Sequence, residues 1–138
     1  SIVIIKIDFS GNVVWQKIID KKQSTVSDRG RYFSFLPVCL KNMIVLLYND
    51  HPVNVTMDET KDTPLEFNNY NNYALTAVSI DKKKGAVLER CNIMDTEDSE
   101  ILPCPEYFDL LTETEVLLYF QKDNKKVKYG RLRMEEEY

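Results

Sequence analysis

Short apolar runs alternate with polar segments along the whole chain. The runs are rich in Ile, Val, Tyr and Phe, which favour strands, and the segments between them carry the Gly, Asn, Asp and Pro that favour turns. No helical period of apolar positions is sustained. The pattern predicts nine strands: Ile2–Asp8, Val13–Ile19, Arg31–Leu40, Met43–Tyr48, Ala74–Ile80, Ala86–Met94, Tyr107–Leu111, Val116–Gln121 and Val127–Met134.

Three details constrain how these strands are arranged. Gly11 and Asn12 tolerate the positive φ of a tight turn, so the first two strands form a hairpin. Pro37 has no N–H to donate, so the third strand belongs at a sheet edge, at a strand start or at a bulge. Tyr107–Leu111 is the stretch where a helix competes with a strand.

The chain also resembles itself at a spacing of just over 70 residues. Two pairs of segments carry the similarity: Ile4–Val14 with Ala77–Val87, and Met43–Tyr48 with Glu115–Tyr119. Self-similarity at a nearly constant period indicates a repeat architecture. We therefore expect Asp8 and Asp81, and likewise Tyr48 and Tyr119, to occupy the same positions in their units.

The repeats predict an all-β fold of two four-stranded antiparallel units, similar to propeller blades, with a closing ninth strand. The units are residues 1–50 and 74–138, and residues 51–73 form a long polar linker loop, within one domain overall. Closing a propeller takes about 4–8 blades. Either further blades therefore lie upstream in a longer protein, or the two units pack as a β-sandwich or barrel. Ser1 follows no Met and leads directly into a strand, which favours a piece of a longer protein.

The pattern also predicts the core and the sheet edges. Val45, Leu47, Val116 and Leu118 lie in nearly continuous apolar runs, which are typical of strands covered on both faces, so they are expected to be buried. A first strand as apolar as Ile2–Asp8 needs a neighbour, because unpaired strand edges attract other strands. We expect the ninth strand to close on it, or else a dimer to form through this edge.

Composition and charge exclude some classes of function. The 138 residues are 43% hydrophobic, so the chain is folded rather than disordered. A net charge of −4 argues against nucleic acid as a partner, because a nucleic-acid surface requires a basic face. No apolar run approaches the length of about 20 residues that spans a bilayer, so no transmembrane segment is expected.

The polar linker contains the candidate ligands. Asn49, Asp50, His51 and Asn54, with Asp58 and Glu59 nearby, offer the oxygen and nitrogen atoms that a hard cation such as calcium takes. Their spacing does not match the twelve-residue calcium loop, so the identity of any metal is left open. The alternative, which we favour, is that Asx side chains and Pro52 form a turn after the fourth strand.

Aromatic residues are the other surplus. Tyr70 and Tyr73 stand among asparagines, a combination suited to stacking on a sugar or a protein while the amides form hydrogen bonds. Trp15, Phe33 and Phe35 are better explained as core residues.

The cysteines and glycines indicate no chemistry of their own. Cys39, Cys91 and Cys104 have no Cys-x-x-Cys spacing and are expected to behave as small hydrophobic residues, although a Cys91–Cys104 bridge is compatible with an oxidising compartment. There is no Gly-rich phosphate loop, no catalytic constellation and no cofactor motif.

Several segments resemble a known group of proteins. They are Ile7–Trp15, Lys21–Gln23, Tyr32–Phe35, Tyr48–Asn54 and the closing hairpin from Glu115–Tyr119 to Tyr129–Leu132. Together they resemble the C-terminal region of large uncharacterised proteins of gut Bacteroides-type bacteria. The resemblance implies a propeller-like fold and an extracellular, periplasmic or outer-membrane-associated location, with any signal upstream, and it implies no activity.

Three functions remain open. The chain is a non-catalytic structural or interaction module, or a glycan- or cation-binding module using residues 49–73, or part of a hydrolase completed by upstream blades. We favour the first, with a glycan or a protein as the expected kind of partner, because no cluster of titratable groups converges in the sequence.

Overall fold

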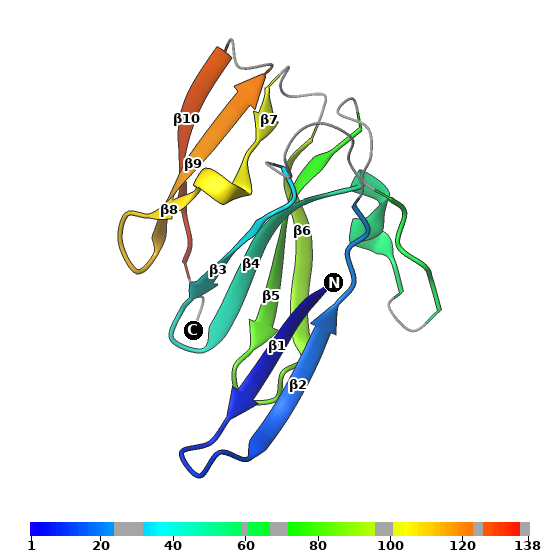
Figure 1. Ribbon diagram of the computed structural model, residues 1–138, viewed down its shortest axis with the longest axis vertical. Helices are drawn as coiled ribbons and strands as arrows, with labels where there is room; N and C mark the ends of the chain where they lie inside the picture. Colours follow the sequence, from blue (N-terminus) through cyan, green and yellow to red (C-terminus); the bar gives the residue numbers. More distant parts are fainter. Residues whose placement is uncertain (24–31, 59–60, 67–71, 96–100, 123–125, 136–138) are drawn as a thin grey trace.

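The structure is a computed structural model that describes residues 1–23, 32–58, 61–66, 72–95, 101–122 and 126–135. Over these residues the protein is all-β, with two short 3-10 helices and no α-helix. The strands form three antiparallel sheets, and no barrel closes among the described strands. Figure 1 shows the three sheets following one another in the order of the chain.

The first sheet is a single hairpin of β1 (Ile2–Ile7) and β2 (Val13–Ile19). Its turn forms because the Asp8 carboxylate accepts backbone N–H bonds from Ser10 and Asn12, each at 2.9 Å. Gly11 supplies the positive φ of 88° that the turn requires.

The second, central sheet is a meander of four strands in the order β3-β4-β5-β6. Its strands are β3 (Phe35–Cys39), β4 (Met43–Asp50), β5 (Ala74–Asp81) and β6 (Val87–Asp95). Pro37 lies in β3, which is an edge strand of this sheet, as its missing N–H predicts. Between β4 and β5 the chain forms a 3-10 helix, η1 (Pro52–Thr56).

The third sheet surrounds β9 (Glu115–Lys122), which pairs with β10 (Lys126–Arg133) along its whole length. Two short strands, β7 (Leu102–Pro103) and β8 (Asp109–Leu110), pair with the other edge of β9. The 3-10 helix η2 (Pro105–Tyr107) separates them. The prediction of one strand over Tyr107–Leu111 is therefore wrong in part, because η2 takes up Tyr107 and the strand is limited to two residues.

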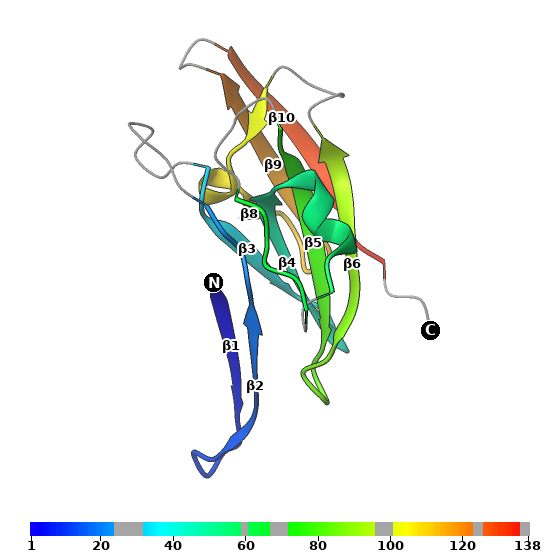
Figure 2. The same cartoon turned by 90° about the vertical axis from the view of Figure 1, so that its right-hand side faces the viewer.

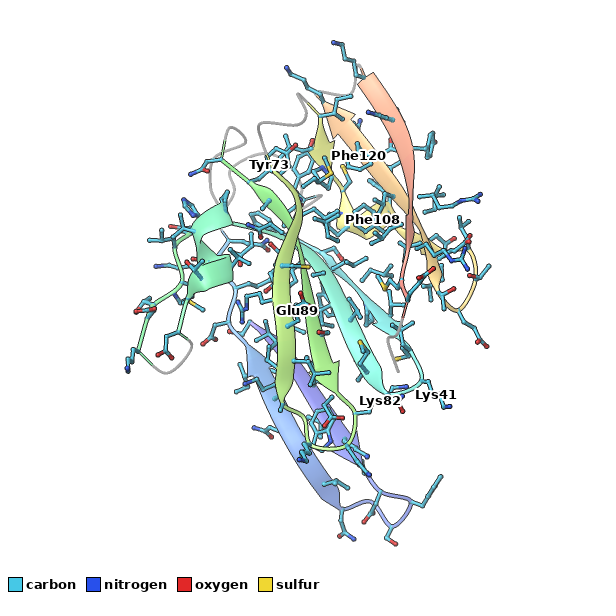
Figure 3. All side chains as sticks on the ribbon, turned by 180° about the vertical axis from the view of Figure 1, so that it is seen from behind. Lys41, Tyr73, Lys82, Glu89, Phe108 and Phe120 are labelled. Atoms are coloured by element: carbon cyan, nitrogen blue, oxygen red, sulfur yellow. The ribbon has the colours of Figure 1, made fainter. Side chains whose placement is uncertain are left out.

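Two apolar cores lie on opposite faces of the central sheet. One core joins it to the third sheet and contains Val45, Leu47, Val116 and Leu118, so the predicted burial of these four residues is confirmed. Phe108 and Phe120, labelled in Figure 3, belong to the same core.

The other core joins the central sheet to the β1–β2 hairpin. It consists of Ile2, Ile19, Leu46, Tyr48, Val78 and Ile80. The central sheet is therefore covered on both faces, which explains why β4 is almost uninterruptedly apolar.

The sheets divide the chain at different places from the predicted units 1–50 and 74–138. Strands β4 and β5 pair directly across the 51–73 loop, so the central sheet combines the end of one unit with the start of the other. The long loop is no barrier to this pairing, because the entropic cost of closing a loop grows only slowly with its length.

Two further predictions are corrected. The last strand, β10, pairs with β9 and not with β1, so it does not close on the first strand. Tyr48 and Tyr119 are not equivalent, because Tyr48 is a fully buried member of the core shared with the preceding hairpin, whereas Tyr119 is only partly buried beside the core shared with the preceding sheet, where Leu118 and Phe120 are the buried residues. The Tyr119 ring is edge-to-face with Tyr129 at 5.4 Å between ring centroids.

Candidate functional site

The predicted polar residues gather where β4 ends and η1 begins. Asn49 and Asp50 are the last two residues of β4, and His51 caps η1, which contains Asn54. Tyr73 directly precedes β5. Two other predicted residues, Glu59 and Tyr70, lie outside the described part of the chain.

Asp50 and Asn54 form a buried network that shapes the loop. The Asn54 amide donates hydrogen bonds to Oδ1 of Asp50 at 2.8 Å and to the Leu65 carbonyl at 2.9 Å. The Leu65 N–H in turn donates to Oδ1 of Asn54 at 2.9 Å, and the His51 N–H donates to Oδ1 of Asp50 at the same distance. These polar atoms therefore hold the loop backbone, which is the turn-forming role that sequence reasoning favoured.

His51 uses both ring nitrogens locally. Its Nδ1 accepts the Val53 N–H at 3.3 Å, and the side-chain amide of Asn72 lies 2.9 Å from Nε2. Which of the two groups donates in the Asn72 contact depends on the imidazole tautomer. In this arrangement neither nitrogen is directed at a ligand.

Asn49 connects three parts of the fold. Its side-chain N–H groups donate to the Pro103 carbonyl in β7 at 2.8 Å and to the Tyr32 carbonyl at 3.3 Å. Its backbone carbonyl accepts a hydrogen bond from the Gln23 amide. A buried asparagine with these partners fastens the central sheet to its neighbours.

Lys21 is a partly buried cation that the sequence reading did not single out. Its ammonium lies 5.4 Å from the Tyr48 ring centroid and 5.7 Å from that of Phe35, and it donates to the Phe33 carbonyl. This geometry combines a hydrogen bond with cation–π attraction. Its sequence signal, a Lys-Lys pair after a strand, looks like an ordinary solvated turn.

Burial changes the acidity of both charged groups at this place. It lowers the pKa of Lys21 to about 8, and the negative charge of Asp50 opposes the decrease. Burial also raises the pKa of Asp50, while the hydrogen bonds from Asn54 and His51 and the charge of Arg90 work in the opposite direction. Oδ2 of Asp50 has no hydrogen-bond partner among the described residues.

Tyr73 is part of the core. It is 1% exposed, packs with Tyr32, Leu102 and Cys104, and donates its hydroxyl to the Ile101 carbonyl at 3.0 Å. Its ring therefore has no open face on which a sugar stacks in this structure. Figure 3 shows Tyr73 at the end of the central sheet near the third sheet.

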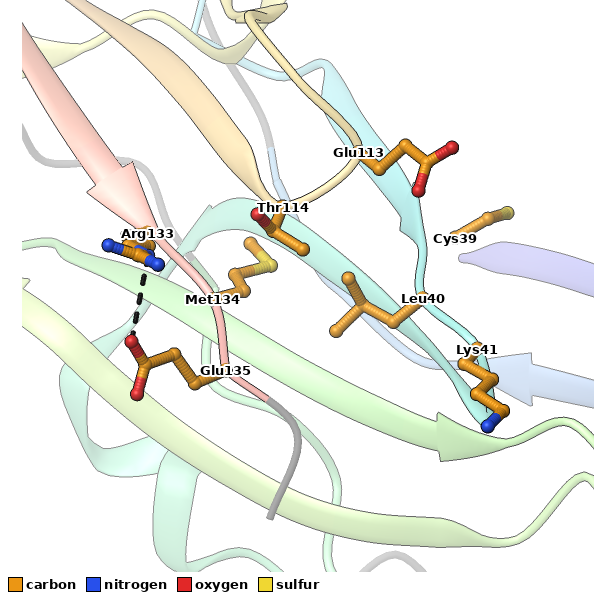
Figure 4. Close-up of a pocket in the computed structure, with 8 residues that line it drawn as sticks. All are labelled: Cys39, Leu40, Lys41, Glu113, Thr114, Arg133, Met134 and Glu135. Carbon is orange, nitrogen blue, oxygen red and sulfur yellow. Dashed lines mark ion pairs between the residues drawn. The ribbon is translucent and has the colours of Figure 1, made fainter. Parts of the chain in front are cut away.

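An open depression lies at the other end of the central sheet, between the β3–β4 turn and the start of β9 (Figure 4). It has Leu40 and Met134 at its apolar part and an ion pair of 3.5 Å between Arg133 and Glu135 at its rim. Both ion-pair side chains are largely solvated, and Cys39, on the opposite side of the depression in Figure 4, has no histidine among the lining residues. The lining therefore offers no activated nucleophile.

The cysteines are all free. Cys104 is buried and Cys91 is half-buried, so the Cys91–Cys104 bridge is absent from the structure. Burial raises the pKa of the Cys91 thiol, with a further contribution from Glu89, which keeps it protonated. Cys39 is exposed, contrary to the expectation of a buried hydrophobic residue, because β3 is an edge strand and this side chain points away from the core.

Within the described ranges, no group of three or more His, Cys, Asp or Glu side chains is arranged to hold a metal ion. None of the described residues forms a helix of the length and apolarity that crossing a membrane requires. Comparison of the chain with protein-family models, curated proteins and solved structures gives no match.

Proposed function

We propose that this chain is a non-catalytic structural or interaction module, the C-terminal part of a larger secreted or envelope protein of a Bacteroides-type bacterium. The observation that carries the proposal is the stack of three antiparallel sheets in chain order, with the middle sheet covered on both faces. Sheets stacked in sequence in this way are typical of propeller blades, which act first as scaffolds.

The sheet order supports blades whose boundaries differ from those of the predicted units. β3 to β6 form a four-stranded meander in sequence order, which is the strand order of one complete blade. On this interpretation β1 and β2 are the last two strands of a preceding blade, and β7 to β10 belong to a following one. Asp8 and Asp81 then occupy equivalent turns, in agreement with their spacing of 73 residues.

The use of the polar residues also supports a module without catalysis. Asn49, Asp50, His51 and Asn54 direct their hydrogen bonds to backbone groups and to one another. Groups that act on a substrate need to point into a cleft, and these point into the fold.

The proposed compartment is tested by fractionating the source bacterium and detecting the protein with an antibody to these residues. We expect it in the envelope or periplasmic fraction, or in the medium. Detection in the cytosol alone would contradict the proposed location.

The proposed role is tested with Asp50→Asn. We expect this variant to lower the melting temperature of the chain, while calcium chloride and neutral oligosaccharides leave the melting temperatures of both proteins unchanged. Stabilisation of the original chain by either probe, lost in Asp50→Asn, would instead identify the 49–73 segment as a binding site.

A further inference from the structure

We propose that the outer face of the β1–β2 hairpin docks against another antiparallel β-sheet of the same gene product, outside these 138 residues, and that this sheet places an indole ring over Gly11. The inference rests on the proposed blade-like module and specifies its partner. Its evidence is an internal comparison between two equivalent hairpins of this chain, one covered and one open.

The two hairpins have related turns, and the β5–β6 turn is one residue longer. In the first, the Asp8 N–H donates to the Asn12 carbonyl, the Gly11 N–H donates to the Asp8 carbonyl, and Oδ1 of Asp8 accepts the N–H two residues on. In the β5–β6 hairpin, Asp81 makes the corresponding bonds with Lys83, Gly85 and Ala86, the last two lying one residue further along the turn than Gly11 and Asn12. Both hairpins also have a register shift at the same step before the aspartate, so β1 corresponds to β5 when residues are counted back from Asp8 and Asp81.

The corresponding side chains differ in exposure. Val78 and Ile80 of β5 are 0% exposed, whereas their equivalents Ile5 and Ile7 are 49% and 59% exposed. The open face of the first hairpin carries six aliphatic side chains: Val3, Ile5, Ile7, Val13, Val14 and Ile18. Isolated apolar side chains on a surface are ordinary, but a contiguous set of this size marks a contact surface.

The covered hairpin shows what kind of partner fits. Val78 and Ile80 are covered by the inner face of the β1–β2 hairpin, through Ile2, Ile4 and Ile19. The partner of the open face is accordingly a sheet that presents aliphatic side chains in the same way. Figures 1 and 2 show that no other labelled strand lies against the outer face of the hairpin, and that the β1–β2 turn extends beyond the β5–β6 turn.

A tryptophan completes the covered contact. The Trp15 ring lies so close to Gly85 that a Cβ there would be 2.6 Å from the ring, and its Nε1–H donates to the Lys82 carbonyl at 3.0 Å. At Gly11, a Cβ would meet nothing within 4 Å among the described residues. The carbonyl that corresponds to that of Lys82 belongs to Phe9, whose side chain is fully exposed.

A second copy of this chain fits less well. Its open sheet faces are the same β1–β2 face and the outer face of β9 and β10, where Tyr129 is exposed, and neither presents an indole ring. The single tryptophan of the chain, Trp15, already packs on Gly85 and donates to the Lys82 carbonyl within the same copy. The indole over Gly11 therefore comes from a different sheet.

The first test is the alkylation rate of Ile5→Cys in a Cys39→Ser background, measured in the 138-residue chain and in the complete gene product. Val53→Cys is the control, because Val53 is similarly exposed but lies in η1. We expect Ile5→Cys to react about tenfold or more slowly in the complete gene product, with Val53→Cys unchanged. Equal rates for Ile5→Cys in the two proteins overturn the proposal.

The second test compares Gly11→Asn with Gly85→Asn, since asparagine tolerates a positive φ better than most residues. In the 138-residue chain, Gly85→Asn is expected to lower the melting temperature and Gly11→Asn to leave it nearly unchanged. In the complete gene product, both are expected to lower it. If Gly11→Asn has no effect there, no ring lies over Gly11.

The covering sheet could belong to the same gene product or to a second copy of this chain. Sedimentation measures whether the 138-residue chain self-associates, and so distinguishes these two sources. If Ile5→Cys becomes protected as this chain self-associates, a second copy covers the face and the proposal is overturned. These readouts are independent of the proposed function, because cell fractionation and ligand stabilisation do not depend on whether Ile5 is covered.

Discussion

Buried polar side chains decide how the ends of the sheets meet. Asn49 joins β4 to β7, and Asn54 joins Asp50 to the Leu65 backbone. A buried donor or acceptor is costly when its partner is removed, so these residues act on stability and not on chemistry.

The first prediction compares two asparagines of the same loop. Asn54→Ala removes three hydrogen bonds of a buried side chain and is expected to destabilise the chain by about 2–4 kcal/mol. Asn72→Ala, at an exposed position, is expected to cost less than about 1 kcal/mol. Urea unfolding measures both, and equal costs would contradict the structural role of Asn54.

The second prediction concerns Lys21 and pH. Its pKa is about 8 in the folded chain and near 10.5 when unfolded, so between these values the unfolded state binds more protons. Stability should therefore rise from pH 8 to pH 10 relative to Lys21→Met, which lacks the titrating group. Parallel pH profiles for the two proteins, measured by urea unfolding, would show that Lys21 titrates normally.

At the scale of elements, the hairpins are joined by one aromatic contact. Trp15 of β2 lies on the β5–β6 turn, and Lys6 of β1 donates to the same Lys82 carbonyl at 3.0 Å. A ring packed against a glycine brings two backbones close together, which no other residue in place of Gly85 permits without displacement.

The third prediction tests this contact. Trp15→Ala is expected to destabilise the chain by about 2–4 kcal/mol, because it removes ring packing and the indole hydrogen bond together. Trp15→Phe keeps most of the packing and is expected to cost about 1 kcal/mol. Phe9→Ala, at the fully exposed turn tip, serves as a control with no expected loss of stability in this chain.

At the scale of the whole molecule, the three sheets are not equally covered. The central sheet contributes to both apolar cores, whereas the β1–β2 hairpin packs through one face only. Elements with fewer buried contacts open at lower free energy.

The fourth prediction follows from that difference. Backbone amides of β1 and β2 in the 138-residue chain should exchange with deuterium faster than those of β4 and β5. Hydrogen-exchange mass spectrometry resolves the two regions as separate peptides. Equal protection would mean that the hairpin opens only when the whole fold opens.

Much of the fold was predictable because it depends on local pattern. Residue type and alternation over a few positions predict the strands of the β1–β2 and β5–β6 hairpins and the turn at Asp8 and Gly11. They also predict the burial of Leu47 and Val116. Pro37 also signals its edge position locally, through its missing N–H.

Which strands pair was decided only by the tertiary structure. The internal sequence similarity suggested that the first unit ends near residue 50, but β4 pairs with β5 across that boundary. The last strand, β10, pairs with β9 and not with the free edge of β1. Similar apolar strands compete for the same neighbours, and local pattern does not rank pairings between distant segments.

The chemistry of the polar cluster was likewise decided in three dimensions. The sequence by itself determined that Asn49, Asp50 and Asn54 stand close together, but not whether they face a ligand or the backbone. Lys21 acquires its lowered pKa only because Tyr48 and Phe35, from β4 and β3, come to lie beside it. Burial is a property of the packed sheets, and residue types alone do not specify it.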